Sequence, residues 1–535
     1  MTRRFLSRGA FLLALATLVI FKLWLVHGET IAGSATQYDA LWYLRSARHW
    51  YWGTTYDWIA FIRPCAYPLC IAVVRLLHIP LRLAIELLQL GGAFTLVLSL
   101  RGLGLNRWFC VASFAVICLH PIGFQQNNYT MSDTFYAGVL WYSLGGLLLT
   151  LAGRSLWVAL ATGIAIAILW NTREEEIVVL ALVAIGSLLF FFSGKDRNTL
   201  SQALRQIMVM CATAISLIAV TYAANDFIFR SFARSEMTAP VFQSFYRSLL
   251  RIKPTEPKPY APITMDTLHR AFAVSPTLAR LRAPLDGPIG ESWRVETRQR
   301  IGTPNEIGVG WIVWATRQAA ATEGIFASPE TARRFFTKAS REINQACDDG
   351  RLPTRFVLDG FLDPFTQSGA QRRLPASVVR VATRTFALWS IEPTSDDAIL
   401  TKEEALLYDQ MTLRRSPKTE PRRGAAIFVE RLIGRHHWAV MVLLHVFATG
   451  AFTYLLLSKR RLKEHRGIAC AIVLLASAVF LRAALLAWLD ATAFDATQDR
   501  FLFPTLPLWS VVLVLAIALG AKAMKRMPTH GTDER

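Results

Sequence analysis

Residues 468–489 read IACAIVLLASAVFLRAALLAWL, an apolar run in which Arg482 is the one charged side chain. A helix of about 20 such residues spans the hydrocarbon core of a bilayer, which is about 30 Å thick. Nine further apolar blocks lie at 10–26, 84–100, 109–119, 135–151, 156–170, 177–192, 208–224, 438–457 and 501–519. We therefore predict an all-α polytopic membrane protein with about ten transmembrane helices.

The overall composition points the same way. Hydrophobic residues make up 53% of the 535 positions and charged residues only 18%, whereas about 25% is usual in soluble proteins. This composition excludes a soluble enzyme, a disordered chain and a fibrous repeat. The net charge of +20 would suggest nucleic acid as a partner of a soluble protein. In a membrane protein such charge sets orientation, so no nucleic-acid partner is expected.

Lysine and arginine gather in alternate short loops between the apolar blocks. They are Arg3, Arg4, Arg8, Arg101, Arg107, Arg154, Lys195, Arg197, Arg205, Lys459, Arg460, Arg461, Lys463, Arg466, Lys522, Lys525 and Arg526. The other loops are richer in acids and amides, so the positive-inside rule predicts both termini in the cytoplasm. The small residues at 31–35 leave a cleaved signal peptide as an alternative, although the apolar run before them favours an uncleaved anchor.

The spans divide the chain into four predicted regions. They are an N-terminal transmembrane module (1–225), an extracytoplasmic insert between spans seven and eight (226–436), the C-terminal transmembrane helices (437–520) and a cytoplasmic tail (521–535). The insert is predicted to be mostly helical. One helix should begin with Ser328 as N-cap and Pro329 in its first turn, and should end at the Asp349-Gly350 turn.

Residues 63–80, RPCAYPLCIAVVRLLHIP, are apolar but short and are interrupted by Arg75 and His78. They predict a helix lying in the outer membrane interface rather than a span. The chain has no CxxC motif and no Cys/His cluster, so a structural zinc site is not expected. Cys65 and Cys347 could form a disulfide if both face an oxidising side, but sequence does not fix such a pairing.

Ionisable residues beside apolar spans are costly and often functional. Those that stand out here fall in the loops predicted to be extracytoplasmic: Asp39, Asp133, Arg173, Glu174, Glu175, Asp499 and Arg500. Any one of them could be polar simply because loops meet water. As a set, placed close against the spans, they predict one shared site at the outer face.

These residue types suit group transfer from a phosphate donor. A carboxylate can take the proton of an attacking hydroxyl, and arginine can bind a phosphate and offset the charge of a phosphate leaving group. Aromatic residues near the first acid could stack on a sugar, or could form the interfacial belt common at membrane surfaces. They are Tyr38, Trp42, Tyr43, Trp50, Tyr51 and Trp52.

The order of these motifs resembles a known family. Asp39 in the first outer loop is followed by Tyr43 and Ala47, and then by Arg63-Pro64-Cys65-Ala66-Tyr67-Pro68-Leu69, an amphipathic stretch and span two. The Ser132-Asp133, Arg173-Glu174 and Arg500–Pro507 segments follow in order. Residues 1–225 and 436–520 thus resemble the GT-C superfamily of membrane glycosyltransferases, which includes lipid A aminoarabinose transferases and protein O-mannosyltransferases.

The resemblance implies a polyprenyl-phosphate-linked sugar donor, transfer at the outer face and inversion at the anomeric carbon. By motif, Asp39 would be the catalytic base, and Arg173 or Arg500 would hold the lipid phosphate. Asp133 would orient substrate or, with Asp39, bind a divalent metal. The remaining expected substrate-binding residues are Tyr43, Arg63, Glu174 and Asp57. Asp57 is a candidate second acid because Ala40 stands where some relatives have Glu.

Three other functions remain open on sequence alone. A transporter or flippase of lipid-linked sugars would need charges at mid-span, where Lys22, Glu86 and Arg482 are the main candidates; Lys22 could instead snorkel to the interface. A surface-polysaccharide polymerase or ligase would suit the basic insert. A non-catalytic scaffold would use the insert to bind a partner. Expected partners are membrane lipids, the donor lipid and a lipid, glycan or protein acceptor, with the bacterial inner membrane as location and the site facing the periplasm.

Overall fold

The structure is a computed structural model, and it describes residues 2–31, 37–53, 55–153, 155–193, 197–308, 310–357, 369–386, 389–391, 400–414, 424–457 and 465–524. Several features predicted above lie outside the described residues: positions 32–35, the side chain of Tyr38, Arg154, Lys195, positions 459–463 and the tail from 525 onward. Within the described ranges, regular structure is helical, and β-type pairing is confined to two isolated bridges, Ile252–Thr354 and Lys258–Ala261. The all-α prediction is therefore confirmed.

The helices of the transmembrane part and of the loops near it are α1 (Thr2–Leu25), α2 (Gln37–Arg48), α3 (Ala66–Leu76), α4 (Leu81–Gly102), α5 (Arg107–Cys118), α6 (Pro121–Gln126), α7 (Ser132–Leu151), α8 (Leu156–Trp170), α9 (Glu176–Ser193), α10 (Arg197–Phe229), α20 (Gly424–Leu457), α21 (Arg466–Thr492), α22 (Asp499–Leu502) and α23 (Leu506–Met524). Nine of the ten apolar blocks each coincide with one of them, and the block 501–519 begins in α22 and continues in α23.

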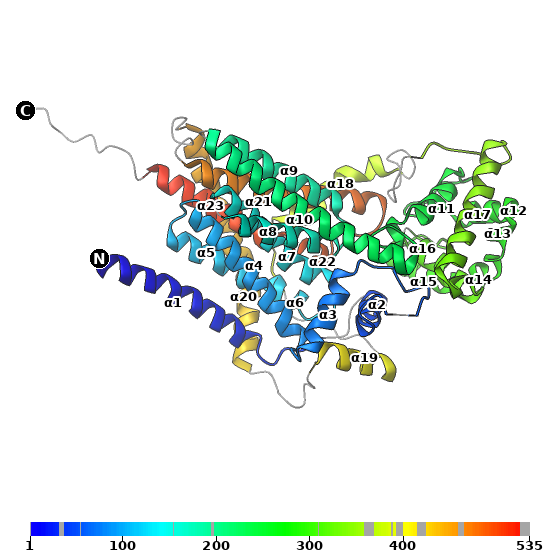
Figure 1. The fold of residues 1–535 in the computed structure, drawn as a ribbon, viewed down its shortest axis with the longest axis horizontal. Coiled ribbons are helices and arrows are strands. Elements are labelled where there is room, and N and C mark those ends of the chain that lie inside the picture. Colours follow the sequence, from blue (N-terminus) through cyan, green and yellow to red (C-terminus); the bar gives the residue numbers. More distant parts are fainter. Residues whose placement is uncertain are drawn as a thin grey trace, which may run out of the picture.

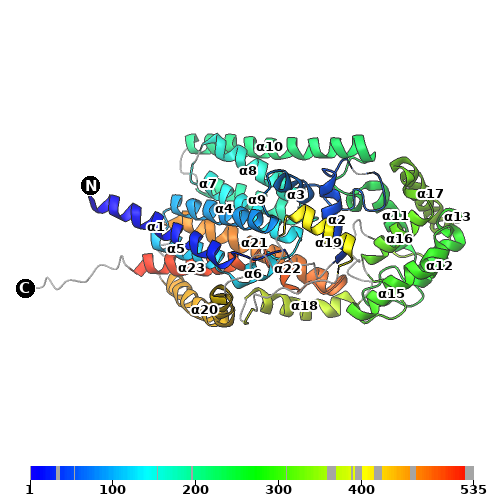
Figure 2. The ribbon, with the colours of Figure 1, turned by 90° about the horizontal axis from the view of Figure 1, so that it is seen from below.

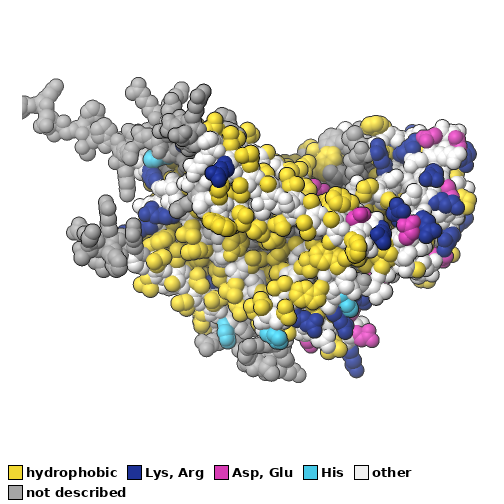
Figure 3. Space-filling view, in the orientation of Figure 1, with side chains coloured by type: hydrophobic (Ala, Val, Ile, Leu, Met, Phe, Trp, Pro, Cys, Tyr) yellow, Lys and Arg dark blue, Asp and Glu magenta, His cyan; other side chains and the backbone are white. Residues whose placement is uncertain are grey.

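Six of these helices, α4, α7, α10, α20, α21 and α23, are long and apolar enough to cross a membrane. Shorter apolar segments are Gly9–Leu25 of α1 and the helices α5, α8 and α9, which carry the remaining four blocks, and α3. The chain is thus a multi-pass helical membrane protein, and the number of ten spans stays a prediction. Figure 3 shows hydrophobic side chains spread over the bundle, and many charged side chains gathered at the end of the molecule that residues 236–348 form.

Close packing of α4 against α7 places the start of α7 inside the bundle. Small residues make this approach possible, as in many membrane helix pairs. A Cβ added to Gly145 would lie 2.8 Å from the backbone nitrogen of Leu96, and one added to Gly92 would lie 2.6 Å from the carbonyl oxygen of Gly138. α7 is therefore buried along most of its length, including its first turn, which carries Asp133.

The insert begins with a compact helical unit at one end of the molecule (Figures 1 and 2). Its elements are η1 (Glu236–Thr238), α11 (Pro240–Arg251), α12 (Met265–Val274), α13 (Pro276–Ala279), α14 (Arg282–Asp286), α15 (Pro288–Ile301), α16 (Trp311–Thr322), η2 (Ile325–Ala327) and α17 (Pro329–Asp348). The caps predicted for α17 are confirmed: the Ser328 side chain accepts from Thr331 N, Pro329 opens the helix, and Gly350 adopts a φ of 74°. The start of α1 and the end of α23 lie at the opposite end of the bundle (Figures 1 and 2).

The later part of the insert returns to the bundle. Helix α18 (Ala370–Thr385) packs along α21, and α19 (Lys402–Thr412) packs against α2 and α3. Val381 of α18 and Tyr408 of α19 belong to the hydrophobic core of the transmembrane helices, whereas α11–α17 form a separate core with the loop after α2. The predicted region 226–436 thus contains two differently packed parts.

Two possibilities that the sequence left open do not hold in the structure. Lys22 does not snorkel: its side chain is 2% exposed, pairs with Glu86 at 3.5 Å and lies over the Phe124 ring. Glu86 also binds Arg82 at 2.6 Å, and Arg82 in turn binds Glu29. Burial of this charge network requires the partners to stay together, because an unpaired buried charge is strongly destabilising. The disulfide considered above is not formed, since Cys65 and Cys347 are both free thiols.

Candidate active site

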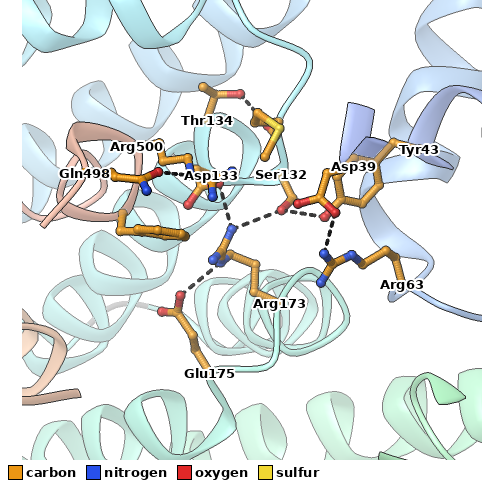
Figure 4. A network of polar contacts seen from close by, with 12 residues as sticks. Asp39, Tyr43, Arg63, Ser132, Asp133, Thr134, Arg173, Glu175, Gln498 and Arg500 are labelled. Carbon is orange, nitrogen blue, oxygen red and sulfur yellow. Dashed lines mark hydrogen bonds and ion pairs between the residues drawn. The ribbon is translucent and has the colours of Figure 1, made fainter. Parts of the chain in front are cut away.

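Several of the predicted site residues meet at the end of the bundle that faces the helical unit of the insert (Figures 1 and 4). They come from elements far apart in sequence: Asp39 from the first turn of α2, Arg63 from the loop before α3, Asp133 from the first turn of α7, Arg173 from the loop between α8 and α9, and Arg500 from α22. The helix termini of the bundle therefore gather these side chains into one cluster.

Asp39 and Arg63 form the outer pair of this cluster. Arg63 Nη2 lies 2.5 Å from Asp39 Oδ1, and both side chains are about one-fifth exposed, at 20% and 22%. Burial alone would raise the pKa of Asp39, but the guanidinium of Arg63 and those of two further arginines outweigh it and hold this pKa below its usual value. Asp39 is therefore ionised at neutral pH and remains accessible to a ligand.

Asp133 and Arg173 form the inner pair. Arg173 Nη1 lies 2.8 Å from Asp133 Oδ2, and the Asp133 side chain is only 1% exposed. The other carboxylate oxygen, Oδ1, has no hydrogen-bond partner. Buried polar atoms are usually hydrogen-bonded, and one left without a partner calls for an explanation such as a catalytic role. Asp133 is therefore held in place by charge and keeps an oxygen that a ligand could use.

Ser132 links the inner pair to Tyr43 of α2. Its hydroxyl oxygen accepts a hydrogen bond from Tyr43 of α2 at 2.9 Å and one from Arg173 at 3.2 Å. Burial raises the pKa of Tyr43 to about 12, so its hydroxyl stays protonated and acts as the donor. From the sequence alone, Ser132 was notable only as the neighbour of Asp133. The structure shows that it links α2 to the loop that carries Arg173.

A second residue that sequence reasoning undervalued is Glu175. It binds Arg173 Nε at 2.9 Å and also pairs with Arg482 of α21, which is 1% exposed. Arg482 in addition donates to the carbonyl oxygen of Phe501 at 2.9 Å. In the sequence, Arg482 is the one charged residue of an apolar block. That position was the only sign in the sequence that it has a role in the site. It closes a chain of alternating charges that ends at Asp133.

Arg500 completes the cluster. Its Nε donates to Gln498 at 3.1 Å, and its guanidinium lies 4.3 Å from the centre of the Phe501 ring. Burial lowers the pKa of Arg500, and the nearby carboxylates of Asp133 and Asp39 partly offset this effect. Because those carboxylates act on Arg500 and Arg500 acts on Asp39, the residues from α2, α7 and α22 share one electrostatic environment.

The cluster carries an excess of positive charge. The four arginines at positions 63, 173, 482 and 500 face three at least partly buried carboxylates, those of Asp39, Asp133 and Glu175. Glu174 also lies near Arg63 and Arg173 but is exposed, so solvent screens its charge. A site of this composition favours an anionic ligand, and arginine is well suited to bind a phosphate.

Asp57 does not join the cluster. Its side chain is exposed, and Oδ1 accepts hydrogen bonds from the backbone nitrogens of Ile59 and Ala60 at 2.9 and 2.8 Å. This is the usual way in which an aspartate stabilises a turn. These bonds give Asp57 a role in the turn rather than in the cluster, and they do not support it as a second acid. Asp499, also noted above, instead faces Arg384 of α18 at 3.9 Å.

Two of the aromatic residues near Asp39 are buried in a hydrophobic core. Trp42 and Tyr51 are each 3% exposed and belong to the core shared with the insert. Trp42 lies between Trp58 and Trp314, with ring centres 5.8 and 5.3 Å away. Trp50 is exposed at 45%. The buried rings therefore serve neither as an interfacial belt nor as an open platform for a sugar.

The donor set does not fit a divalent metal. Asp39 and Asp133 each face an arginine, and a cation between them would have to compete with four guanidinium groups. Across the described parts of the chain, no group of three or more histidine, cysteine or acidic side chains is placed to hold a metal ion. We derive no role for a metal from these residues.

No protein-family model and no curated protein matches the chain. Among solved structures, it is similar to ArnT from Cupriavidus metallidurans, both in the apo state and bound to undecaprenyl phosphate. ArnT is a lipid A aminoarabinose transferase of the GT-C type, the group that the sequence resembles.

For both ArnT structures, the sequence identity to this chain is 13% and the TM-score is 0.29. The matches cover 96% of this chain and 77% or 78% of the ArnT chains. Values this low do not establish a shared activity.

Proposed function

We propose that this chain is a membrane glycosyltransferase of the GT-C type, which transfers a sugar from a polyprenyl-phosphate-linked donor to an acceptor at the outer face of the membrane. One observation carries the proposal: an ionised, accessible carboxylate, Asp39, lies in the same cluster as Arg173 and Arg500. Sugar transfer with a phosphate as leaving group requires a base for the acceptor hydroxyl and positive charge to stabilise the phosphate. Asp39 and the arginines beside it supply both.

Asp39 accepts the proton of the attacking hydroxyl of the acceptor. The acceptor oxygen forms a bond to the anomeric carbon as the bond from that carbon to the phosphate oxygen breaks. The lipid phosphate leaves with the electron pair, and Arg500 and Arg173 stabilise its charge. A single displacement of this kind inverts the configuration at the anomeric carbon. Asp133, through its free oxygen, orients the sugar or the acceptor.

The outer location follows from the charge pattern of the loops. The site lies at the end of the bundle opposite the start of α1 and the end of α23 (Figures 1 and 2). Because the positive-inside rule assigns the basic loops near those helix ends to the cytoplasm, the site faces the periplasm of a bacterial inner membrane. The donor headgroup then sits at the membrane surface, where a polyprenyl chain can stay in the lipid.

The proposal predicts that the phosphate, and not the lipid chain alone, is recognised. Purified protein should be stabilised against heat by a polyprenyl monophosphate, and much less by the matching polyprenol. Replacing Arg500 with Gln should weaken phosphate binding by roughly 10- to 100-fold, because a hydrogen bond to a charged group contributes about 1.5–3 kcal/mol. Titration of the melting temperature against lipid concentration gives both affinities.

The matched control is Arg334→Gln on α17, which removes an arginine that is 73% exposed and outside the site. It should bind the phosphate as the unaltered protein does. Equal binding of the phosphate and the alcohol, or unchanged binding by the Arg500→Gln protein, would rule out Arg500 as a phosphate ligand and remove the main support for a lipid-phosphate donor.

A further inference from the structure

The first outer loop is held by the insert as well as by its own helices. Arg317 of α16 is fully buried and donates to the carbonyl oxygen of Trp58 through Nε at 3.0 Å and Nη2 at 2.7 Å. Nη2 also reaches the carbonyl oxygen of Ala60 at 3.5 Å. One side chain of the insert thus satisfies backbone acceptors in the loop that leads to Arg63.

Glu236 of the insert strengthens this attachment. Its carboxylate lies 3.3 Å from Arg317 Nη1, which compensates the buried charge. Its backbone nitrogen donates to the carbonyl oxygen of Phe61 at 2.8 Å. The loop is therefore bound at three nearby positions, the last of which is two residues before Arg63.

Trp314, one turn before Arg317 on the same helix, contacts the site itself. The Arg63 guanidinium lies 5.3 Å from the centre of the Trp314 ring and 6.0 Å from that of Trp42. An arginine within about 6 Å of such a ring is attracted to its face. Arg63 thus contacts two aromatic rings as well as the Asp39 carboxylate.

From this arrangement we infer that the insert is a working part of the site, in which Trp314 and Arg317 are positioning residues that hold Arg63 against Asp39. The inference deepens the proposed function, because it gives the insert a role in the same site. It does not require the insert to bind an acceptor. In this view the insert and the transmembrane helices form the site jointly, and Trp314 acts through Arg63 rather than on the substrate.

The first test measures coupling between Trp314 and Arg63 without any assay of activity. Melting temperatures are compared for Trp314→Leu, Arg63→Gln and the double variant. If Trp314 holds Arg63, the two falls in melting temperature are not additive. Trp314→Leu then lowers the melting temperature clearly less in the Arg63→Gln protein than in the unaltered protein. Trp311→Leu is the matched control, because Trp311 is on the same helix but packs against Trp293, and its effect should add to that of Arg63→Gln.

The second test measures sugar transfer in cells that lack the native gene and carry each variant. Trp314→Leu should lower transfer roughly 10- to 100-fold, as expected for a misplaced site residue, while Trp314→Phe keeps an aromatic face and retains most of it. In the Arg63→Gln background, Trp314→Leu should cause little further loss. A Trp311→Leu protein should transfer normally.

The two tests separate the inference from the proposed function. If no transfer is found for any protein, the proposed function fails, but thermal coupling still supports the positioning of Arg63 by the insert. Additive melting-temperature changes for Trp314 and Arg63 would overturn the inference. So would equal loss of transfer from Trp314→Leu and Trp314→Phe, or normal transfer by Trp314→Leu.

Discussion

Asp39→Asn is expected to reduce sugar transfer by about 10²- to 10⁴-fold, the usual contribution of a general base, while the fold stays intact. Asparagine has the shape of aspartate but cannot take the proton of the acceptor. Its partner Arg63 would lose an ionic contact, yet Arg63 is 20% exposed and can be hydrated. The sugar content of the envelope, measured by mass spectrometry in cells that express only this variant, reports the loss.

Asp57→Asn is the matched control for this experiment. It makes the same chemical change in the same loop region, but Asp57 lies outside the cluster and asparagine can still accept the turn hydrogen bonds. Transfer should be unchanged. If Asp39→Asn supports normal transfer at a normal level of folded protein, Asp39 is not the base and another acid, with exposed Glu174 the first candidate, must be considered.

Glu86→Gln is expected to cause the largest loss of stability. Glu86 is the shared partner of Lys22 at 3.5 Å and Arg82 at 2.6 Å, and all three side chains are at most 5% exposed. Removing its charge leaves Lys22 buried without its carboxylate, and breaking a buried ion pair costs about 3–5 kcal/mol. Thermal unfolding of the purified protein should show a clear fall in melting temperature.

Two companion variants sharpen this test. Replacing both Glu86 and Lys22 with Met should recover much of the loss, because the uncompensated lysine is removed as well. Glu330→Gln on α17 removes a carboxylate that is 42% exposed and should change the melting temperature little, as is usual for surface ion pairs. A Glu86→Gln protein as stable as the unaltered one would show that this buried network does not hold α1 to α4.

Local features of the sequence predicted the fold well. The apolar blocks coincide with helices because a segment that meets lipid must satisfy its backbone hydrogen bonds internally. The start of α17 was predictable from Ser328 and Pro329, because capping depends on a few adjacent residues. The gathering of Asp39, Asp133, Arg173 and Arg500 was also predictable, since helix ends on one side of a bundle lie close together.

Contacts between distant segments were not predictable in the same way. Arg482 and Glu175 are 307 positions apart, and nothing local indicates that they form a pair. Asp57 looked like a site acid because its loop was correctly placed, but its carboxylate satisfies the backbone of a turn. Trp42 looked like a surface aromatic in the sequence. It is covered by Trp314 of the insert, and neither segment alone indicates that the two pack together.

The central claim is that this protein consumes a sugar carried on a polyprenyl phosphate. The most direct measurement is mass spectrometry of the lipids and the envelope of cells from which the gene has been deleted. The account predicts that one polyprenyl-phosphate-linked sugar accumulates while the same sugar disappears from an envelope acceptor, and that the intact gene reverses both changes. An unchanged lipid pool together with an unchanged envelope would contradict it.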